Sequence, residues 1–388
     1  MTKITYILIL VIFAFGCKKP YNPAVSTSNV NILVVEGMIN TGGADSTIIK
    51  LSRTGIVNNK KTANLETAAI VTVENSQGTV FTLAEITKGT YAAPPVNLDN
   101  TKQYRLRVKT SNGKIYWSDF ADVKVTPPID SIGYTIQNNG MQIYANTHDP
   151  NNNTHYYKYT YRETWQFNAR YMASYITDGR TLSVRTAAQQ VFYCFGTDTS
   201  TYTIINSTAA LAKDIAYQVP IIAIDFGSEK LGTKYSILLR QQALTKEAYA
   251  FFENLKKNTE SLGSIFDAQP SQLIGNIHNS TDPSEPVIGY ISAGTTQQKR
   301  IYITKQSLPA NFHVVYPYGC EIDSAYNMHN PNIPHPFYTD EWLTPYPPAG
   351  LALIPFINAN NDDGYLFSSI PCTDCTIRGT TQQPAFWK

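Results

Sequence analysis

Cysteine has the most definite chemistry of the residue types in this chain, and the first cysteine stands at a distinctive place. Residues 1–3 are a short basic start, and the apolar run 4–16 leads directly into Cys17. This run is too short for a hydrocarbon core, which needs about 20 residues, but it fits the hydrophobic region of a secretory signal. A small residue followed at once by cysteine is the pattern that lipoprotein signal peptidase cleaves. We expect a lipoprotein signal peptide over residues 1–16 and a lipid anchor on Cys17. An ordinary secretory signal with a chance cysteine is the alternative.

The four remaining cysteines are Cys194, Cys320, Cys372 and Cys375. An exported protein enters an oxidising compartment, where an even number of cysteines indicates disulfides. Cys372 and Cys375 form a C-x-x-C, which could instead be a redox pair or half of a zinc site. A redox motif usually opens a helix in a βαβ unit, and a zinc site requires a second pair of closely spaced cysteines or histidines as ligands. We therefore predict structural disulfides. Of the three possible pairings we favour those in which each tail cysteine reaches a distant partner, a closure worth roughly 4 kcal/mol.

No other residues form a recognisable chemical constellation. Six histidines are scattered without a helical pair, and the closest two are His329 and His335 in a Pro-rich segment. The chain lacks a G-x-S-x-G, a P-loop and a G-x-G-x-x-G that opens a helix. Residues 358–364 (NANNDDG) faintly resemble a calcium loop, but the final bidentate Glu is missing, so a polar turn is favoured. We predict no catalytic, cofactor-binding or metal-ligating residue, and no cofactor.

Composition excludes two classes of protein. The 388 residues carry 31 Lys and Arg against 29 Asp and Glu, a net charge of +2. This balance provides no basic field for displacing counterions from nucleic acid. Apolar residues make up 43%, which is enough to build a core, so an acidic disordered chain is also excluded. Aromatic residues reach 12%, mostly the 26 Tyr, a bias that favours β-strands.

The elements that position these residues are predicted to be mostly strands. After a polar tether over residues 17–29, residues 30–126 alternate apolar and polar positions between turn signals, including 76–78 (SQG) and 111–113 (SNG). This spacing predicts an N-terminal immunoglobulin-like β-sandwich. Pro127 and Pro128 break the pattern, so we place a domain boundary there.

Residues 127–388 are predicted to form a larger β-rich domain whose tail is held by disulfides. Within it, Tyr157, Tyr159, Tyr161, Trp165 and Phe167 share one face of a strand, which indicates the buried face of a sheet. One amphipathic helix is predicted at about residues 245–260, because Thr245 is a suitable N-cap and apolar residues recur at helical spacing after it.

The stretch 312–348 is crowded with Tyr and Pro and shows no periodicity. A long irregular segment in a compact protein is usually functional or docked on a partner. Tyrosine offers a large contact area at little cost in rotamer entropy, so we name Tyr338, Trp342 and Tyr346 as partner-contact candidates. The alternative is that this stretch packs over its own sheet and is pinned there by Cys320.

Several motifs together resemble one family. They are LVVEG (33–37), LSRT (51–54), IDSI (129–132), the segment 235–270, EPVIGYISA (285–293) and the tail C-T-D-C-x-x-R-G-T-T-x-x-P-x-F-W (372–387). This combination resembles the domain of unknown function 4249 (DUF4249), a family of lipoproteins of Bacteroidota, over nearly the whole mature chain. The resemblance implies an outer-membrane lipoprotein, often encoded beside a TonB-dependent transporter of the starch-utilisation type, and brings no established site residues. We expect the cell surface rather than the periplasmic leaflet, although Lys18 and Lys19 are basic where acidic residues commonly signal surface display.

The phylum implied by the resemblance also suggests modification sites, because its members glycosylate Ser or Thr in Asp-Ser/Thr followed by a small or aliphatic residue. Three such sequences give Ser46, Ser131 and Ser324 as candidates. Ser46 lies in a polar turn and is expected to be the most accessible, whereas Ser131 starts a domain and is expected to be partly buried.

These observations lead to one functional hypothesis and two alternatives. The first is a non-enzymatic accessory or substrate-capture partner of a TonB-dependent transporter in nutrient uptake. It would be anchored to the membrane by its N-terminal lipid, with an outer-membrane β-barrel or another envelope protein as partner and no nucleic acid. The second is a structural or adhesion subunit of another cell-envelope complex. The third is an uncharacterised hydrolase.

Overall fold

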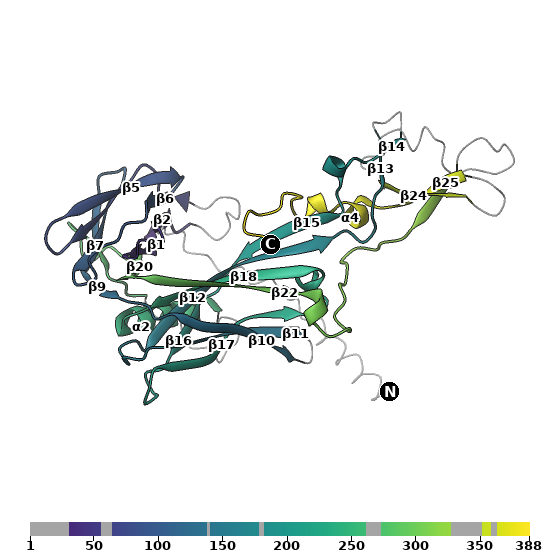
Figure 1. The fold of residues 1–388 in the computed structure, drawn as a ribbon. Coiled ribbons are helices and arrows are strands. Elements are labelled where there is room, and N and C mark those ends of the chain that lie inside the picture. The colour runs from purple at the N-terminus through teal and green to yellow at the C-terminus, as the bar shows by residue number, and fades with distance from the viewer. Residues whose placement is uncertain are drawn as a thin grey trace, which may run out of the picture.

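The computed structural model describes residues 31–55, 64–137, 140–177, 182–260, 273–326, 351–357 and 363–388. Over these residues the chain is mostly β, as predicted. Two β-rich units lie side by side, and a third part, which we call the distal extension, reaches away from them (Figure 1). The predicted signal peptide, Cys17 and the tether lie outside the described residues.

The first unit, which we call the N-terminal unit, begins with nine strands in chain order. They are β1 (Leu33–Asn40), β2 (Thr47–Arg53), β3 (Asn64–Leu65), β4 (Ile70–Asn75), β5 (Val80–Thr87), β6 (Thr90–Ala93), β7 (Gln103–Lys109), β8 (Ile115–Ser118) and β9 (Ala121–Lys124). Both predicted tight turns are present, with Gly78 at φ +83° and Gly113 at φ +88°. Alternate residues of β7, Tyr104, Leu106 and Val108, are buried in the core of this unit. The period-two pattern of the sequence therefore places the core correctly.

Three short strands from much later in the chain complete the N-terminal unit. They are β19 (Ile277–Asn279), β20 (Val287–Gly289) and β21 (Ala293–Gly294). Strand β21 lies between β1 and β9, where Ala293 is paired with both Ile39 and Val123. Because β9 also pairs with β7, the hydrogen-bonded path β7-β4-β5-β6-β2-β1-β21-β9 closes on itself. The predicted division into residues 30–126 and 127–388 needs correction here, because residues 277–294 belong to the first unit. The physical reason is that β1 and β9 would otherwise both leave an edge of unpaired backbone groups.

The C-terminal unit is a sandwich of two antiparallel sheets. One sheet has the order β10 (Ile129–Gln137), β11 (Gly140–His148) and β17 (Ile215–Asp225). The other has the order β15 (Tyr193–Thr199), β12 (Tyr156–Asn168), β18 (Lys234–Ala243) and β22 (Thr296–Thr304), with β16 (Ile204–Ser207) also paired to β12. The predicted aromatic face is confirmed, since Tyr157, Tyr159 and Tyr161 of β12 are buried in the core that both sheets share. Thr160 and Arg162, on the opposite face, are exposed.

The predicted helix is also confirmed, as α2 (Lys246–Glu260). The Oγ1 atom of Thr245 accepts a hydrogen bond from the backbone N–H of Ala248 at 3.2 Å, which is the expected N-cap. Ala248 and Phe251 are buried, and the helix contacts β12 and β16.

The two units are joined by hydrogen bonds around Asp45, in the turn between β1 and β2. Its carboxylate accepts from Nε2 of Gln298 at 2.6 and 2.8 Å, and one of its oxygens lies 3.6 Å from Nη2 of Arg240. The Oγ1 atom of Thr126 accepts from the backbone N–H of Ala243 at 2.9 Å. Polar contacts to strands β18 and β22 therefore fix the N-terminal unit against the C-terminal sandwich.

The remaining elements are short. Two 3-10 turns lie in the C-terminal unit, η2 (Glu229–Leu231) and η3 (Lys305–Ser307). The distal extension contains β13 (Tyr175–Thr177), β14 (Leu182–Val184), η1 (Ala187–Gln189), β23 (Asp323–Tyr326), β24 (Leu351–Ile357), β25 (Asp363–Ser368), α4 (Ile370–Thr373) and η4 (Cys375–Ile377). It comprises the described residues of 170–193, 315–326 and 351–377, and it is built where β12 ends and β15 begins.

Candidate functional site

The distal extension is attached to the C-terminal unit by a disulfide between Cys194 and Cys375, whose Cα atoms are 5.7 Å apart. Cys194 lies on β15 opposite Phe167 of β12. These three residues and Ala169 form a small buried core at the base of the extension. The backbone N–H of Cys375 also donates to the carbonyl of Val191 at 2.9 Å.

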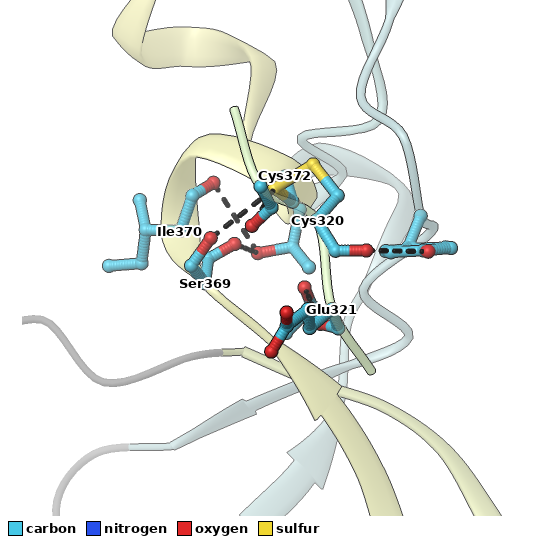
Figure 2. Close-up of a disulfide and its surroundings, with 9 residues drawn as sticks. Cys320, Glu321, Ser369, Ile370 and Cys372 are labelled. Carbon is cyan, nitrogen blue, oxygen red and sulfur yellow. Dashed lines mark hydrogen bonds between the residues drawn. A yellow bond between two sulfur atoms is a disulfide. The ribbon is translucent and has the colours of Figure 1, made fainter. Parts of the chain in front are cut away.

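A second disulfide, between Cys320 and Cys372, joins two segments of the extension to each other, with 5.6 Å between the Cα atoms. Figure 2 shows these two cysteines beside Glu321, Ser369 and Ile370. Tyr171 is hydrogen-bonded to both cysteines of this disulfide. Its backbone N–H donates to the carbonyl of Cys372 at 2.9 Å, and its hydroxyl donates to the carbonyl of Cys320 at 3.0 Å. Three segments distant in sequence are therefore fixed together.

The predicted pairing of each tail cysteine with a distant partner is thus confirmed. The redox and zinc alternatives for Cys372 and Cys375 are excluded in this structure, since each thiol is committed to a different disulfide. Within the described residues, no group of three or more His, Cys, Asp or Glu is arranged to hold a metal ion.

The last residues of the chain hold the base of the extension against the sheet edge. The side chain of Arg378 is 13% exposed, and its Cζ atom lies 5.1 Å from the ring centroid of Phe167 and 5.5 Å from that of Tyr318. Thr380 exchanges two backbone hydrogen bonds with Phe195 of β15, at 2.7 and 3.1 Å. The ring of Trp387 packs 5.2 Å from that of Phe195. The tail motif, residues 372–387, therefore has a structural role, and we call it the tail clasp. Its Gly379 cannot be replaced by a larger residue without a clash, because a Cβ there would lie 2.6 Å from the carbonyl oxygen of Phe195.

The Tyr- and Pro-rich stretch is docked on the protein's own sheets over its first residues. Phe312 is buried against Phe226, with ring centroids 4.0 Å apart. The N–H of Val315 donates to the carbonyl of Gly227 at 2.9 Å, and the hydroxyl of Tyr316 accepts from Nδ2 of Asn168 at 3.1 Å. The predicted partner-contact residues Tyr338, Trp342 and Tyr346 lie outside the described residues. The strands on either side of that segment, β23 and β24, both pair with β25 in the extension.

Large apolar side chains are exposed on the distal extension. They are Met172 (49%), Val184 (67%), Tyr193 (52%), Val315 (62%), Tyr318 (37%), Ile322 (49%) and Ile377 (50%). Met172 follows Tyr171, and Ile322 lies two residues after Cys320, so both sit beside the second disulfide. Sequence analysis missed this set, because an apolar residue in a short strand or turn carries no local signal that says whether it is buried.

The glycosylation candidates lie in three different settings. Ser46 is half-buried next to Asp45, whose carboxylate is bonded to the second unit. Ser131 is exposed on β10, contrary to the partial burial expected from sequence, although its hydroxyl accepts from Nδ2 of Asn146 at 2.8 Å. Ser324 lies on β23. Ser131 is therefore more accessible than Ser46, the reverse of the order expected from the sequence.

A cleft of about 190 Å³ lies where the two units meet, and sequence analysis missed it because its lining comes from four separate segments. It is lined by residues that include Asp119, Asp122, Glu247, Asn276, Tyr290 and Ser292. Burial raises the pKa of the Tyr290 hydroxyl. Ligand sites usually measure about 300–1,000 Å³. The cleft is smaller, and we do not assign substrate capture to it.

Comparison with known proteins identifies one family. The family model described as Domain of unknown function (DUF4249) matches residues 18–300. The match spans both β-rich units, whereas the tail motif of residues 372–387, on which part of the sequence resemblance rests, lies beyond it. No curated protein matches the chain. Among the described residues, no helix is long and apolar enough to cross a membrane.

Proposed function

The chain belongs to the DUF4249 family, and from this premise we propose that it is a lipid-anchored outer-membrane protein of Bacteroidota. In this proposal it is a non-enzymatic accessory partner of a TonB-dependent transporter in nutrient uptake, and the distal extension is the part that contacts the barrel.

The observation that carries this proposal is the construction of the distal extension. Two disulfides, the hydrogen bonds of Tyr171 and the tail clasp hold its segments in one arrangement, and yet it leaves seven large apolar side chains exposed. Exposed apolar surface on a rigid support indicates a protein contact, because little ordering entropy is lost when it binds.

The position of the proposed anchor is compatible with such a contact. Thirteen residues separate Cys17 from Asn31, where the described structure begins, and they reach about 50 Å at most when extended. The distal extension lies at the end of the molecule away from the N-terminal unit (Figure 1), so contact with a barrel requires the molecule to lie along the membrane, which a tether of this length allows.

The test is co-purification from outer membranes in mild detergent, with the bound proteins identified by mass spectrometry. We expect a β-barrel transporter to co-purify with the parent protein and to be lost from the variant Val184→Asp/Ile322→Asp/Ile377→Asp. The matched control is Val80→Asp/Ile86→Asp on β5 of the N-terminal unit, where the side chains are 54% and 59% exposed. This control should retain the transporter.

Each other outcome contradicts part of the proposal. If the control and the extension variant retain the transporter equally, the extension is not the contact. If another envelope protein co-purifies in place of a transporter, the protein is a structural or adhesion subunit instead. An unchanged Tm for both variants is required for either conclusion. The same design with Tyr338, Trp342 and Tyr346 changed together to Ala tests the sequence-predicted contact.

The anchor is tested separately by Cys17→Ser. Without the thiol no acyl chain can be attached, so we expect the protein to move from the membrane fraction to the soluble fraction. A variant that remains with membranes after a carbonate wash would show that Cys17 is not the anchor.

A further inference from the structure

The outer face of the sheet β15-β12-β18-β22 carries two arginines that lie close together. Arg162 of β12 is paired with Leu238 of β18, and Leu238 is paired in turn with Arg300 of β22. Residues paired across neighbouring strands project from the same face of a sheet. The two Cα atoms are therefore about 10 Å apart, which is two strand spacings. We call Arg162 and Arg300 the arginine pair, because their long side chains can reach one ligand above Leu238.

Neither arginine has a negatively charged partner among the described residues. On this face Arg162 is bordered by Leu238 on one side and by Thr199 of β15 on the other. Arg300 is bordered by Leu238, because β22 is the last strand of this sheet. The side chain of Arg162 is exposed and makes no hydrogen bond or ion pair with any described residue. The positive charge of the pair is therefore uncompensated.

Arg240, the next arginine on this face, shows the usual arrangement. Its Nη2 atom lies 3.6 Å from a carboxylate oxygen of Asp45. The same carboxylate accepts hydrogen bonds from Nε2 of Gln298 at 2.6 and 2.8 Å. Asp45 is thus committed to these two residues and makes no ion pair with the arginine pair.

Arg300 is held in one orientation although it has no counter-charge. Its Cζ atom lies 3.7 Å from the ring centroid of Phe386, and its Nη1 donates to Oγ of Ser236 at 3.0 Å. Burial lowers the pKa of Arg300, Tyr302 acts in the opposite direction, and the positive charge of Arg162 lowers the pKa further. Because arginine stays protonated in proteins, the pair keeps two positive charges that repel each other.

This arrangement suits a ligand that carries an oxyanion. A guanidinium group presents its N–H donors in a planar fork, which matches two oxygens of a carboxylate or phosphate group. A bound anion would also remove the repulsion between the two charges, and it would bind beside partly buried groups, where water screens the attraction less. An arginine that already faces a carboxylate, such as Arg240, offers neither gain.

A nucleic acid fits this site less well, because the net charge of +2 provides no extended basic field. The N-terminal unit borders this face through Asp45 and the tail clasp borders it through Phe386, so the pair lies between two other parts of the chain. We propose that Arg162 and Arg300 form a binding site for the oxyanion group of a small ligand, either the carboxylate of a sugar acid or a phosphate group. This inference does not depend on the partnership with a transporter.

The test is an NMR titration of the arginine Nε–H signals in the full chain, held in micelles with neutral headgroups at an ionic strength of about 0.15 M. The probes are inorganic phosphate and galacturonate, and neutral galactose is the comparison. The variant is Arg162→Gln. The matched control is Arg107→Gln on β7, which removes the same charge from another arginine that lies against an aromatic ring, 5.4 Å from the ring centroid of Trp117.

We expect saturable shifts of the Arg162 and Arg300 signals with at least one of the two anions, and none with galactose. The affinity should fall at least tenfold in Arg162→Gln and stay unchanged in Arg107→Gln. The anion that binds more tightly identifies the ligand group as carboxylate or phosphate. The absence of saturable shifts with both anions would overturn the proposal. An equal loss in the two variants would also overturn it, since the anion would then respond only to net charge.

A second pair of variants tests the missing counter-charge without any ligand. Leu238→Glu places a carboxylate between the two arginines, whereas Leu238→Gln has the same shape without the charge. We expect a higher Tm for Leu238→Glu than for Leu238→Gln, together with loss of anion binding in Leu238→Glu alone. An equal or lower Tm for Leu238→Glu would show that the positive charge of the pair is already compensated, and it would contradict the proposal.

Discussion

At the residue scale, Glu163 shows how a charge is accommodated on the buried face of β12. Its side chain is 1% exposed, and its carboxylate accepts from the hydroxyl of Tyr235 and from Nζ of Lys230, both at 2.6 Å. Burial first, and then the charge of Glu163, raise the pKa of Tyr235 well above its usual value, so the phenol keeps its proton and donates. The ammonium group of Lys230 compensates the buried negative charge of Glu163.

Removing that cation should destabilise the fold. Lys230→Met leaves a buried carboxylate with only its hydroxyl partner, and we expect the free energy of unfolding to fall by about 3 kcal/mol. Adding Glu163→Gln should recover part of this loss, because the uncompensated charge is gone. Urea denaturation measures both effects. The control is Lys257→Met in the exposed pair with Glu253 on α2, which should cost less than about 0.5 kcal/mol. Equal losses for Lys230→Met and Lys257→Met would contradict this account.

A second residue-scale prediction concerns pH. The carboxylate of Asp130 lies 2.8 Å from Nδ1 of His148, and this hydrogen bond and charge raise the pKa of His148. A raised pKa in the folded state means that the pair stabilises the fold below the unfolded pKa of about 6.5. That contribution is lost as pH rises through the folded pKa. NMR titration of the His148 ring should give a lower pKa in Asp130→Asn than in the parent. An identical pKa in the two proteins would rule out the pairing.

At the element scale, the C-terminal tail acts as a clasp whose parts have separate roles. Cys375 attaches it to β15, Cys372 attaches it to the segment that carries Cys320, and Thr380 continues the pairing along β15. The connection between β16 and β17, which crosses from one sheet of the sandwich to the other, contrasts with this, since hydrogen bonds to Asp214 rather than a covalent link hold it in place. The bonds of the tail and the hydrogen bonds to Asp214 thus each hold an exposed segment in a defined position.

The clasp gives a prediction about the disulfides. The Cys194–Cys375 bond closes 181 residues, and Cys194→Ala/Cys375→Ala should lower the free energy of unfolding by about 5 kcal/mol in the chain-entropy account. Peptide mapping without reduction should find Cys194 linked to Cys375 and Cys320 to Cys372, with no free thiol among the four. Recovery of a Cys372–Cys375 peptide, or of stoichiometric zinc, would contradict the structure.

At the scale of the whole molecule, the N-terminal unit depends on chain that arrives about 150 residues later. Strand β21 is bonded to β1 and β9 together, and β20 pairs in parallel with the first half of β1. Val287, Ile291 and Ala293 belong to the core of the N-terminal unit. The two units are therefore interdependent in folding, although each has its own core.

This dependence can be tested with fragments. We expect residues 31–126 alone to lack a cooperative thermal transition and to associate, because β1 and β9 are left as open edges. The same fragment joined to residues 273–295 through a long flexible linker should fold and remain monomeric. Circular dichroism and analytical ultracentrifugation compare the two. A cooperative, monomeric 31–126 fragment would show that the returning strands add nothing essential.

The sequence alone determined those features that depend on neighbours close in the chain. The alternation from Tyr157 to Phe167 identified the buried face of β12, the spacing after Thr245 identified α2, and Gly78 and Gly113 marked their turns, because each pattern reflects a local backbone period or angle. The four cysteines that remain when Cys17 is set aside predicted disulfides, on the expectation that the chain is exported.

Only the tertiary structure decided which distant groups meet. It selected Cys194 for Cys375 and Cys320 for Cys372, inserted Ala293 between β1 and β9, and left Leu211 and Ile322 exposed although their types suit a core. The physical reason is that strand pairing, disulfide closure and burial depend on contacts between segments up to about 250 residues apart. Such contacts are set by competition among all possible partners and leave no trace in the local spacing of residues.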